Sequence, residues 1–212
     1  MTMYDGIRLS IFTVIFLAVW LIISKSSRAN KKRKTRIAFI VCVIFALLST
    51  LVPLENQLIA FHSAETAFKY NRKGDINAVI GGKRSAMILY SDTKTSAPTI
   101  YPRTERGYNL DVYPRFSTEN YSAKSKEKSD ELYNIVIYHV KKTSDFYLMI
   151  WKSFSTNTIE ISDNYSSEFI CIEEGEKDGS KYFQYYAYVE NLSLNDYEIL
   201  INGAKYTYQD FL

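Results

Sequence analysis

The 212-residue chain carries 26 Lys and Arg against 23 Asp and Glu, and this charge is unevenly distributed. Residues 1–54 hold eight basic residues and one acid, whereas residues 55–212 hold 18 basic and 22 acidic residues. The larger part is therefore mildly acidic, which excludes an electrostatic basis for nucleic-acid binding by it. Its length, about 155 residues, is enough for one domain with its own hydrophobic core.

Two long apolar runs near the N-terminus predict transmembrane helices over about 8–24 and 37–54. Their charge-free parts, 16 and 18 residues long, would span roughly 24 and 27 Å, close to the ~30 Å hydrocarbon core of a bilayer. Arg8 and Lys25 flank the first run, and their side chains can extend outward to the head groups. A cleavable signal peptide is the alternative for this run, but residues 1–8 have no net positive charge and no small-x-small cleavage site follows.

A basic linker without acidic residues joins the two runs. Its Lys and Arg residues are Lys25, Arg28, Lys31, Lys32, Arg33, Lys34 and Arg36. Short loops of this kind are retained on the cytoplasmic side, so we expect a two-span protein of the cytoplasmic membrane with its N-terminus and C-terminal domain outside. The same charges also attract anionic lipid head groups, by about 1 kcal/mol per residue.

Three regions follow from this pattern: a two-helix membrane anchor (1–55), a helical neck (56–70) and a β-rich extracytoplasmic domain (71–212). In the neck, apolar residues recur at helical spacing and Ser63 is a suitable N-cap. We expect the apolar stripe of the neck to pack on the domain. The only two cysteines, one in the second apolar run and one in the outer domain, should lie on different sides of the membrane surface and form no disulfide with each other.

Short runs rich in Ile, Val, Phe and Tyr predict β-strands in the outer domain, and 17 of the 18 tyrosines lie beyond residue 55. The expected hairpins pair 76–80 with 85–90, 132–141 with 146–154, 168–173 with 181–191, and 197–201 with 204–208. Asn202-Gly203 is the favoured type I′ loop of the last hairpin, in which Ile199 should face Tyr206. Gly81 and Gly82 should supply positive φ at the first turn, and one more strand is expected near 110–113. The expected fold class is a membrane-anchored α+β protein whose domain is mostly antiparallel.

The sharpest catalytic hypothesis is a dyad of Cys171 and His139, because a reactive thiolate needs a neighbouring base or cation. Both residues lie in apolar strands, where a buried structural cysteine and a hydrogen-bonded histidine are the more common arrangement. The acids Glu168, Glu173, Glu174 and Glu190 are available for glycosidase-like chemistry. No motif for a nucleophile, nucleotide or metal site occurs, so we predict no catalytic residue, no metal ligand and no cofactor.

Tyrosines on the strand 181–191 are the better functional lead. Tyr182, Tyr186 and Tyr188 share one strand face, and amphipathic rings in a row are typical of protein or glycan contact surfaces. The alternative is a sheet face covered by the neck or by the loops of 91–131. We predict that these three residues form a binding face.

The segments SAETAFKYN and GDINAVIGGKRSAMILY carry a resemblance that extends over residues 1 to about 90. This part is similar to small two-helix membrane-anchored proteins of low-GC Gram-positive bacteria that have no assigned function. The resemblance implies a bacterial origin and the same topology, and it transfers no site residue.

The sequence therefore predicts an extracytoplasmic binding or sensing module, without enzymatic activity, anchored in the lipid bilayer. Its expected partner is an envelope protein or a cell-wall glycan, and not nucleic acid. Two other functions stay open, a cell-wall-directed surface hydrolase and an accessory or immunity membrane protein.

Overall fold

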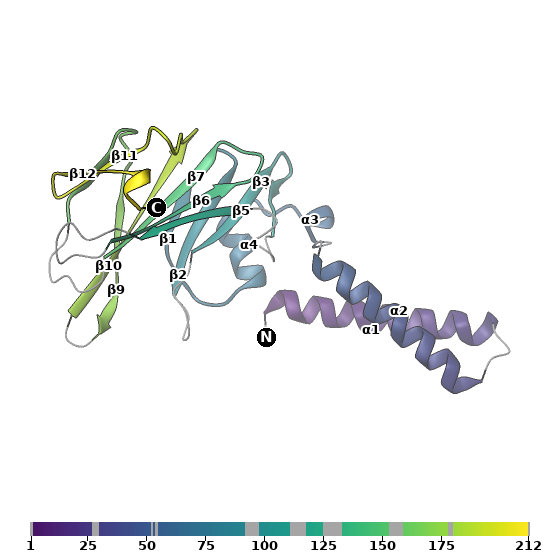
Figure 1. Cartoon of the computed structure of the whole chain (residues 1–212). Coiled ribbons are helices and arrows are strands. Elements are labelled where there is room, and N and C mark those ends of the chain that lie inside the picture. The colour runs from purple at the N-terminus through teal and green to yellow at the C-terminus, as the bar shows by residue number, and fades with distance from the viewer. Residues whose placement is uncertain are drawn as a thin grey trace.

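The computed structural model describes residues 2–26, 30–51, 53, 55–91, 98–110, 118–124, 133–152, 159–177 and 180–211. Its helices are α1 (Met3–Ser26), α2 (Lys31–Leu51), α3 (Glu55–Leu58), α4 (Ala64–Asn71) and the 3₁₀ helix η1 (Tyr208–Phe211). Its strands are β1 (Asp75–Gly81), β2 (Ser85–Ser91), β3 (Thr99–Thr104), β4 (Gly107–Tyr108), β5 (Thr118–Lys124), β6 (Tyr133–Val140), β7 (Asp145–Lys152), β8 (Ile161–Asp163), β9 (Ile170–Lys177), β10 (Ser180–Glu190), β11 (Glu198–Ile201) and β12 (Ala204–Thr207). A β-rich domain is joined to a projecting pair of helices (Figure 1).

Three antiparallel sheets form the domain, in strand orders β1-β2-β3-β4, β5-β6-β7-β10-β9 and β12-β11-β8. The predicted α+β class with a mostly antiparallel domain is confirmed. All four expected hairpins are present, as β1–β2, β6–β7, β9–β10 and β11–β12. The strand expected near 110–113 is not seen at Leu110, which follows β4 outside any strand, and its other residues lie outside the described part of the chain.

The five-stranded sheet lies in the middle of the domain, with a hydrophobic core on each face. On one face Ile137, Leu148 and Ala187 pack with Ile199 of the three-stranded sheet, and all four are fully buried. On the other face Val140 of β6, Tyr147 of β7 and Tyr186 of β10 pack against β1–β3 of the four-stranded sheet. Because side chains alternate along a strand, β10 contributes to both cores.

A third core covers the outer face of the four-stranded sheet. There α4 packs Ala67 and Phe68 against β2 and β3, so the predicted packing of the neck on the domain is confirmed. Ser63 is the N-cap of α4, since its hydroxyl accepts a hydrogen bond from the Thr66 amide at 3.2 Å. A continuous helix over the neck is wrong, because α3 ends at Leu58 and residues 59–63 are not helical.

The closing hairpin has the predicted register, with Ile199 opposite Tyr206. Asn202 (φ 50°) and Gly203 (φ 77°) both have positive φ, as a type I′ loop requires. The reason expected for the glycines of the first hairpin is wrong, because neither Gly81 nor Gly82 has a left-handed backbone conformation.

The helices α1 and α2 pack side by side and project away from the domain (Figure 1). Phe12 contacts Phe45 edge to face, with ring centroids 6.3 Å apart. In the described part of the chain, α1 is the one helix long and apolar enough to cross a membrane, over Met3–Ile23. The apolar stretch of α2, Thr35–Ala46, is shorter.

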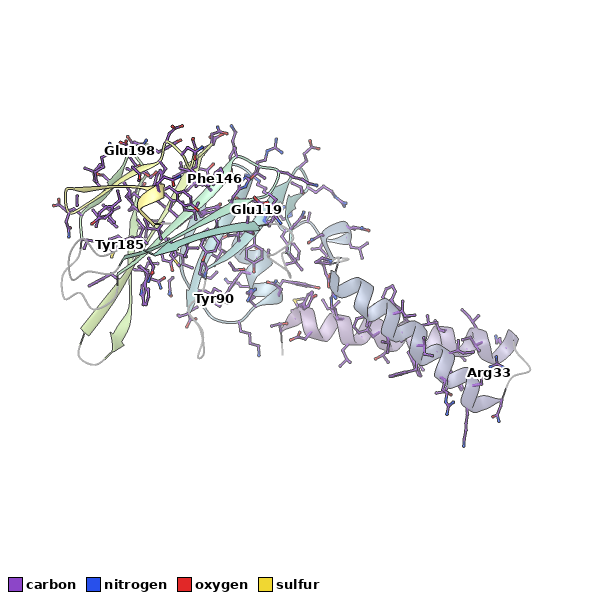
Figure 2. The ribbon with its side chains drawn as sticks, in the orientation of Figure 1. Arg33, Tyr90, Glu119, Phe146, Tyr185 and Glu198 are labelled. Carbon is purple, nitrogen blue, oxygen red and sulfur yellow. The ribbon has the colours of Figure 1, made fainter. Side chains whose placement is uncertain are left out.

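Lys25 of α1 and the basic residues at the start of α2 lie at the end of the helix pair that is remote from the domain, where Arg33 is labelled in Figure 2. The expected linker over residues 25–36 is wrong in extent, since α1 continues to Ser26 and α2 begins at Lys31. The basic residues from Lys31 to Arg36 are therefore helical. Positive charge opposes the dipole at a helix N-terminus, so these residues are not placed there to stabilise the helix.

A buried ion pair fastens the N-terminal end of α1 to the domain. The Arg8 guanidinium donates to both oxygens of Glu55, at 3.0 and 3.2 Å, and both residues are buried. Arg8 also lies 4.4 Å from the centroid of the Tyr4 ring, which contacts Tyr70 of α4. The expected outward extension of Arg8 is wrong, because the first turns of α1 dock on the domain instead of ending in solvent.

Candidate functional site

A pocket of about 880 Å³ opens where several turns of the two larger sheets meet. Its residues come from the β1–β2 turn, the β3–β4 turn, the β6–β7 turn and the end of β10. They are Lys83, Arg84, Pro102, Arg103, Thr104, Glu105, Val140, Lys141, Lys142, Thr143, Ser144 and Asn191. The volume lies within the range typical of ligand sites.

The lining of this pocket is strongly basic. Lys83, Arg84, Arg103, Lys141 and Lys142 face a single acid in the lining, Glu105. Residues 55–212 carry 22 acidic and 18 basic residues, so the charge of the pocket is opposite in sign to the net charge of the domain. A concave surface lined with one sign of charge concentrates ligands of the opposite sign.

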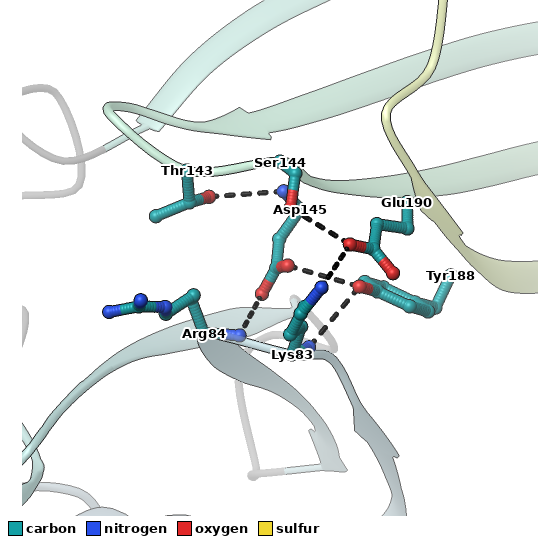
Figure 3. Close-up of polar contacts among 7 residues, drawn as sticks. All are labelled: Lys83, Arg84, Thr143, Ser144, Asp145, Tyr188 and Glu190. Carbon is teal, nitrogen blue, oxygen red and sulfur yellow. Dashed lines mark hydrogen bonds and ion pairs between the residues drawn. The ribbon is translucent and has the colours of Figure 1, made fainter.

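A buried carboxylate, Asp145, accepts a hydrogen bond from Arg84 of the pocket lining (Figure 3). Its Oδ2 accepts hydrogen bonds from the Arg84 amide at 2.7 Å and from the Ser85 hydroxyl at 2.5 Å, and its Oδ1 accepts one from the Tyr188 hydroxyl at 3.0 Å. Asp145 is completely buried. Three short polar contacts thus replace the water that a buried carboxylate loses.

Gly82 allows the β1–β2 turn to approach this carboxylate. A Cβ atom at Gly82 would lie 2.7 Å from Asp145 Oδ2 and 2.6 Å from the Tyr147 hydroxyl. Only a residue without a side chain fits between the two sheets here. Close approach, and not positive φ, explains the second glycine of the turn.

The turns around the pocket are tied together. The Arg103 amide donates to the Arg84 carbonyl at 2.6 Å, and the Asn191 amide donates to the Ser144 carbonyl at 2.8 Å. Lys83 forms an exposed ion pair with Glu190, with Nζ 2.8 Å from Oε1. These links connect the β1–β2, β3–β4 and β6–β7 turns, so the walls of the pocket are held in place in the absence of ligand.

Tyr188, which donates to Asp145, has a pKa that its surroundings shift strongly. Burial, the hydrogen bond to Asp145 and the charges of Asp145 and Glu190 together raise the pKa of Tyr188 to about 12, against the opposing effect of the Lys83 amide. The phenol therefore stays protonated and donates to Asp145 throughout the physiological pH range. Burial likewise raises the pKa of the neighbouring Tyr147 well above its usual range.

The predicted tyrosine binding face is wrong. Tyr186 is 3% exposed and packs in the core between the two larger sheets, and Tyr188 is half-buried beside Asp145. The backbone of Tyr182 pairs with Gly175, and its side chain lies outside the described part of the structure. The face is covered by β1–β3, as the alternative of a covered sheet face expected; β3 belongs to the 91–131 stretch named as a possible cover, whereas β1 and β2 precede it.

Cys171 and His139 are not brought together. They lie on β9 and β6, which are separated by β7 and β10, so about 14 Å of strand spacing lies between them. His139 stacks on Phe146 with centroids 4.3 Å apart, and its Nε2 lies 3.1 Å from the Thr143 carbonyl oxygen. Both cysteines are free, and Cys171 is exposed.

Of the four acids singled out from the sequence, the two whose side chains the structure describes, Glu168 and Glu190, do not share a cleft. Glu190 pairs with Lys83 at the edge of the pocket, and Glu168 is exposed before β9. The side chains of Glu173 and Glu174 lie outside the described part. Within the residues that the structure describes, no group of three or more His, Cys, Asp and Glu side chains could hold a metal ion.

Sequence reasoning missed the pocket because its residues come from distant turns. Asp145 and Arg84 are 61 positions apart, and Arg103 belongs to a region dominated by expected loops. One signal was available: β10 carries aromatic residues on both faces, which is typical of a strand buried on both sides.

Comparisons with protein-family models, with curated proteins and with solved structures give no significant match. The functional argument therefore rests on the geometry of the pocket. Its basic side chains can form charge-assisted hydrogen bonds with phosphate or carboxylate groups, and Thr104, Thr143 and Asn191 add neutral polar groups.

Proposed function

We propose that the protein is a membrane-anchored extracytoplasmic binding module whose pocket binds an anionic component of the cell envelope. The observation that carries this proposal is the collection of five Lys and Arg side chains in one pocket of a domain that is acidic overall. Their ligand is a phosphate- or carboxylate-bearing polymer, because an open pocket at the domain surface accommodates a chain that continues beyond it.

The arrangement of the helices supports the extracytoplasmic placement. The basic end of the helix pair lies remote from the domain, and positive residues at helix ends favour the cytoplasmic side. With α1 crossing the membrane from outside to inside and α2 returning, both the N-terminus and the domain lie outside. The Arg8–Glu55 pair then sits at the outer membrane surface, where α1 meets the domain.

Binding to a defined polymer tests the pocket. The full chain in neutral detergent should bind poly(glycerol phosphate), measured by calorimetry, and should not bind neutral dextran. The triple variant Arg84→Gln, Arg103→Gln, Lys142→Gln should weaken binding by at least about tenfold, because each lost charge-assisted contact is worth roughly 1 kcal/mol. Affinity should fall with added salt, as expected for exposed charges.

A matched control removes the same charge elsewhere on the domain. Lys69, Lys73 and Lys205 are exposed and do not line the pocket. Their triple change to Gln should leave the affinity within about twofold, since screened charges beyond a Debye length of about 8 Å contribute little. Equal losses in the two triple variants would assign binding to overall charge and reject the pocket.

Thiol labelling tests the topology separately. Single cysteines are introduced as Arg33→Cys and Asp196→Cys in a background of Cys42→Ser and Cys171→Ser; both positions are exposed. An impermeant thiol reagent applied to intact cells with a permeabilised wall should label the variant at position 196 and not the one at position 33. The reverse pattern would place the domain inside the cell and reject the proposed function.

A further inference from the structure

A second pocket, of about 670 Å³, lies between the two long helices at their basic end. It is lined by Phe16 of α1, by Asn30 just before α2, and by Lys32, Thr35, Arg36 and Phe39 of α2. This pocket lies on the helix pair and shares no residue with the basic pocket of the domain.

The α2 residues of this pocket form one stripe. Residues 32, 35, 36 and 39 are spaced at i, i+3, i+4 and i+7, which places them on one helix face. Along this face polar groups come first and the Phe39 ring follows, about 4.5 Å deeper than Arg36 at 1.5 Å per residue. Phe16 faces the stripe from α1. The pocket therefore has a cationic mouth and an aromatic floor.

Residues 1–54 contain no acidic side chain near the positive charge of the mouth. Asp5 is the single acid in residues 1–54, and it lies at the other end of α1. Lys32 and Arg36 are exposed, and positive charge near the start of a helix opposes the helix dipole. An external anion at this position would satisfy both side chains.

We infer that this pocket binds one anionic glycerophospholipid of the cytoplasmic leaflet. The lipid phosphate lies between Lys32 and Arg36, and an acyl chain passes over Phe16 and Phe39. The inference rests on the proposed two-span topology, which places this end of the helix pair at the cytoplasmic membrane surface. It goes beyond the general attraction of basic residues to head groups, because a pocket with an apolar floor distinguishes a lipid from a soluble anion.

Native mass spectrometry of the full chain in neutral detergent tests this inference with three probes: phosphatidylglycerol, phosphatidylcholine and glycerol 3-phosphate. Phosphatidylglycerol should bind at least about tenfold more tightly than either of the others, because it alone combines a net negative head group with acyl chains. Glycerol 3-phosphate binding equal to that of the anionic lipid would identify a free-phosphate site and overturn the lipid assignment.

Two double variants with the same loss of charge separate the pocket from its surroundings. Lys32→Gln with Arg36→Gln removes the mouth, whereas Lys25→Gln with Arg33→Gln removes two exposed charges of the same helix ends that do not line the pocket. The first pair should weaken phosphatidylglycerol binding about tenfold and the second by less than about threefold. Equal weakening would reduce the site to general surface attraction.

Two further variants guard against loss of structure. Exchange of the two cations, Lys32→Arg with Arg36→Lys, keeps the charge and should keep the affinity, while Phe39→Ala should weaken lipid binding without removing charge. Unchanged lipid binding by Phe39→Ala would contradict the aromatic floor. Incorporation into neutral phosphatidylcholine nanodiscs tests membrane insertion, and the thiol labelling tests the topology. Failures of the lipid site, of insertion and of the topology therefore give different results.

Discussion

Two buried carboxylates are stabilised in different ways in this protein. Glu55, at the junction between helix pair and domain, is 5% exposed and is matched by the Arg8 guanidinium. Asp145, between the two larger sheets, is completely buried, and its hydrogen-bond donors are an amide and two hydroxyls. Within the described residues, no salt bridge joins Asp145 to a cation.

The difference follows from the surroundings of each group. A charge matched by one cation depends on that partner, whereas a carboxylate bound by several neutral donors shares its stabilisation among them. The carboxylate at the junction is therefore matched by one replaceable cation, beside the aromatic contact of Tyr4 with Tyr70. The Asp145 cluster joins two sheets and also positions the Arg84 side of the basic pocket.

Removal of Asp145 should have the largest effect. Asp145→Ala leaves the Arg84 amide and the Ser85 and Tyr188 hydroxyls without their acceptor, and we expect a loss of about 4 kcal/mol of unfolding free energy. Chemical denaturation of the full chain in neutral detergent, followed by domain fluorescence, measures it. Asp145→Asn keeps one acceptor oxygen and should cost about half as much. Equal stability of the Ala variant and the wild type would contradict the role of the cluster.

The junction should be the second most sensitive position. Arg8→Ala strands a buried carboxylate and should destabilise the contact between α1 and the domain by about 3 kcal/mol. Hydrogen exchange at α3 and α4, measured by mass spectrometry, should rise, while exchange in the five-stranded sheet should not. The double change Arg8→Met, Glu55→Leu replaces the pair by apolar groups and should restore most of the protection. A double variant as unprotected as Arg8→Ala would show that the pair itself is required.

The comparison also explains how far the sequence could predict this fold. Local signals sufficed for Ser63, which caps α4, and for Asn202-Gly203, which sets the register of the last hairpin. Both depend on residues within a few positions of each other. The role of Asp145 could not be predicted, because its partners Arg84, in the β1–β2 turn, and Tyr188, in β10, lie 61 and 43 positions away.

The burial of the tyrosine face and the ion pair at the junction escaped prediction for the same physical reason. A tyrosine at an alternating strand position has the same sequence pattern whether its face is covered or exposed, so Tyr186 was assigned to a surface and lies in a core. Arg8 beside an apolar run has the pattern of a membrane flank, and only the packing of α1 on the domain places it next to Glu55. Chain topology, and not local pattern, decides both cases.

Adding a single methyl group at Gly82 should force apart the two sheets that meet at Asp145. Gly82→Ala places a Cβ within 2.8 Å of three atoms of the cluster, and we expect a loss of about 2 kcal/mol from the strain. Gly203→Ala is the matched control, because it faces open space and meets only the cost of positive φ (+77°), about 1 kcal/mol. Thermal unfolding of both variants measures the difference, and a more stable Gly82→Ala than Gly203→Ala would argue against the close approach.

The smallest effects come from two tyrosines, Tyr188 beside Asp145 and Tyr70 at the junction. Tyr188 donates to Asp145, whereas the hydroxyl of Tyr70 at the junction is buried with no hydrogen-bond partner among the described residues. At pH 7, Tyr188→Phe should therefore cost about 1 kcal/mol, and Tyr70→Phe should be neutral or slightly stabilising because it removes an unsatisfied polar group. Urea denaturation of the two variants under identical conditions provides the comparison.

Alkaline pH makes the Tyr188 comparison specific. Burial raises the pKa of Tyr188 to about 12 in the folded chain, whereas an unfolded tyrosine ionises near pH 10. The stabilisation from the protonated phenol is complete below pH 10 and is lost as the pH rises toward 12, because the unfolded state alone gains from ionisation in this window. The stability difference between wild type and Tyr188→Phe should therefore narrow from pH 10 to pH 12. A difference that stays constant over this window would show that Tyr188 ionises equally in both states, and that its hydroxyl does not donate to a buried carboxylate.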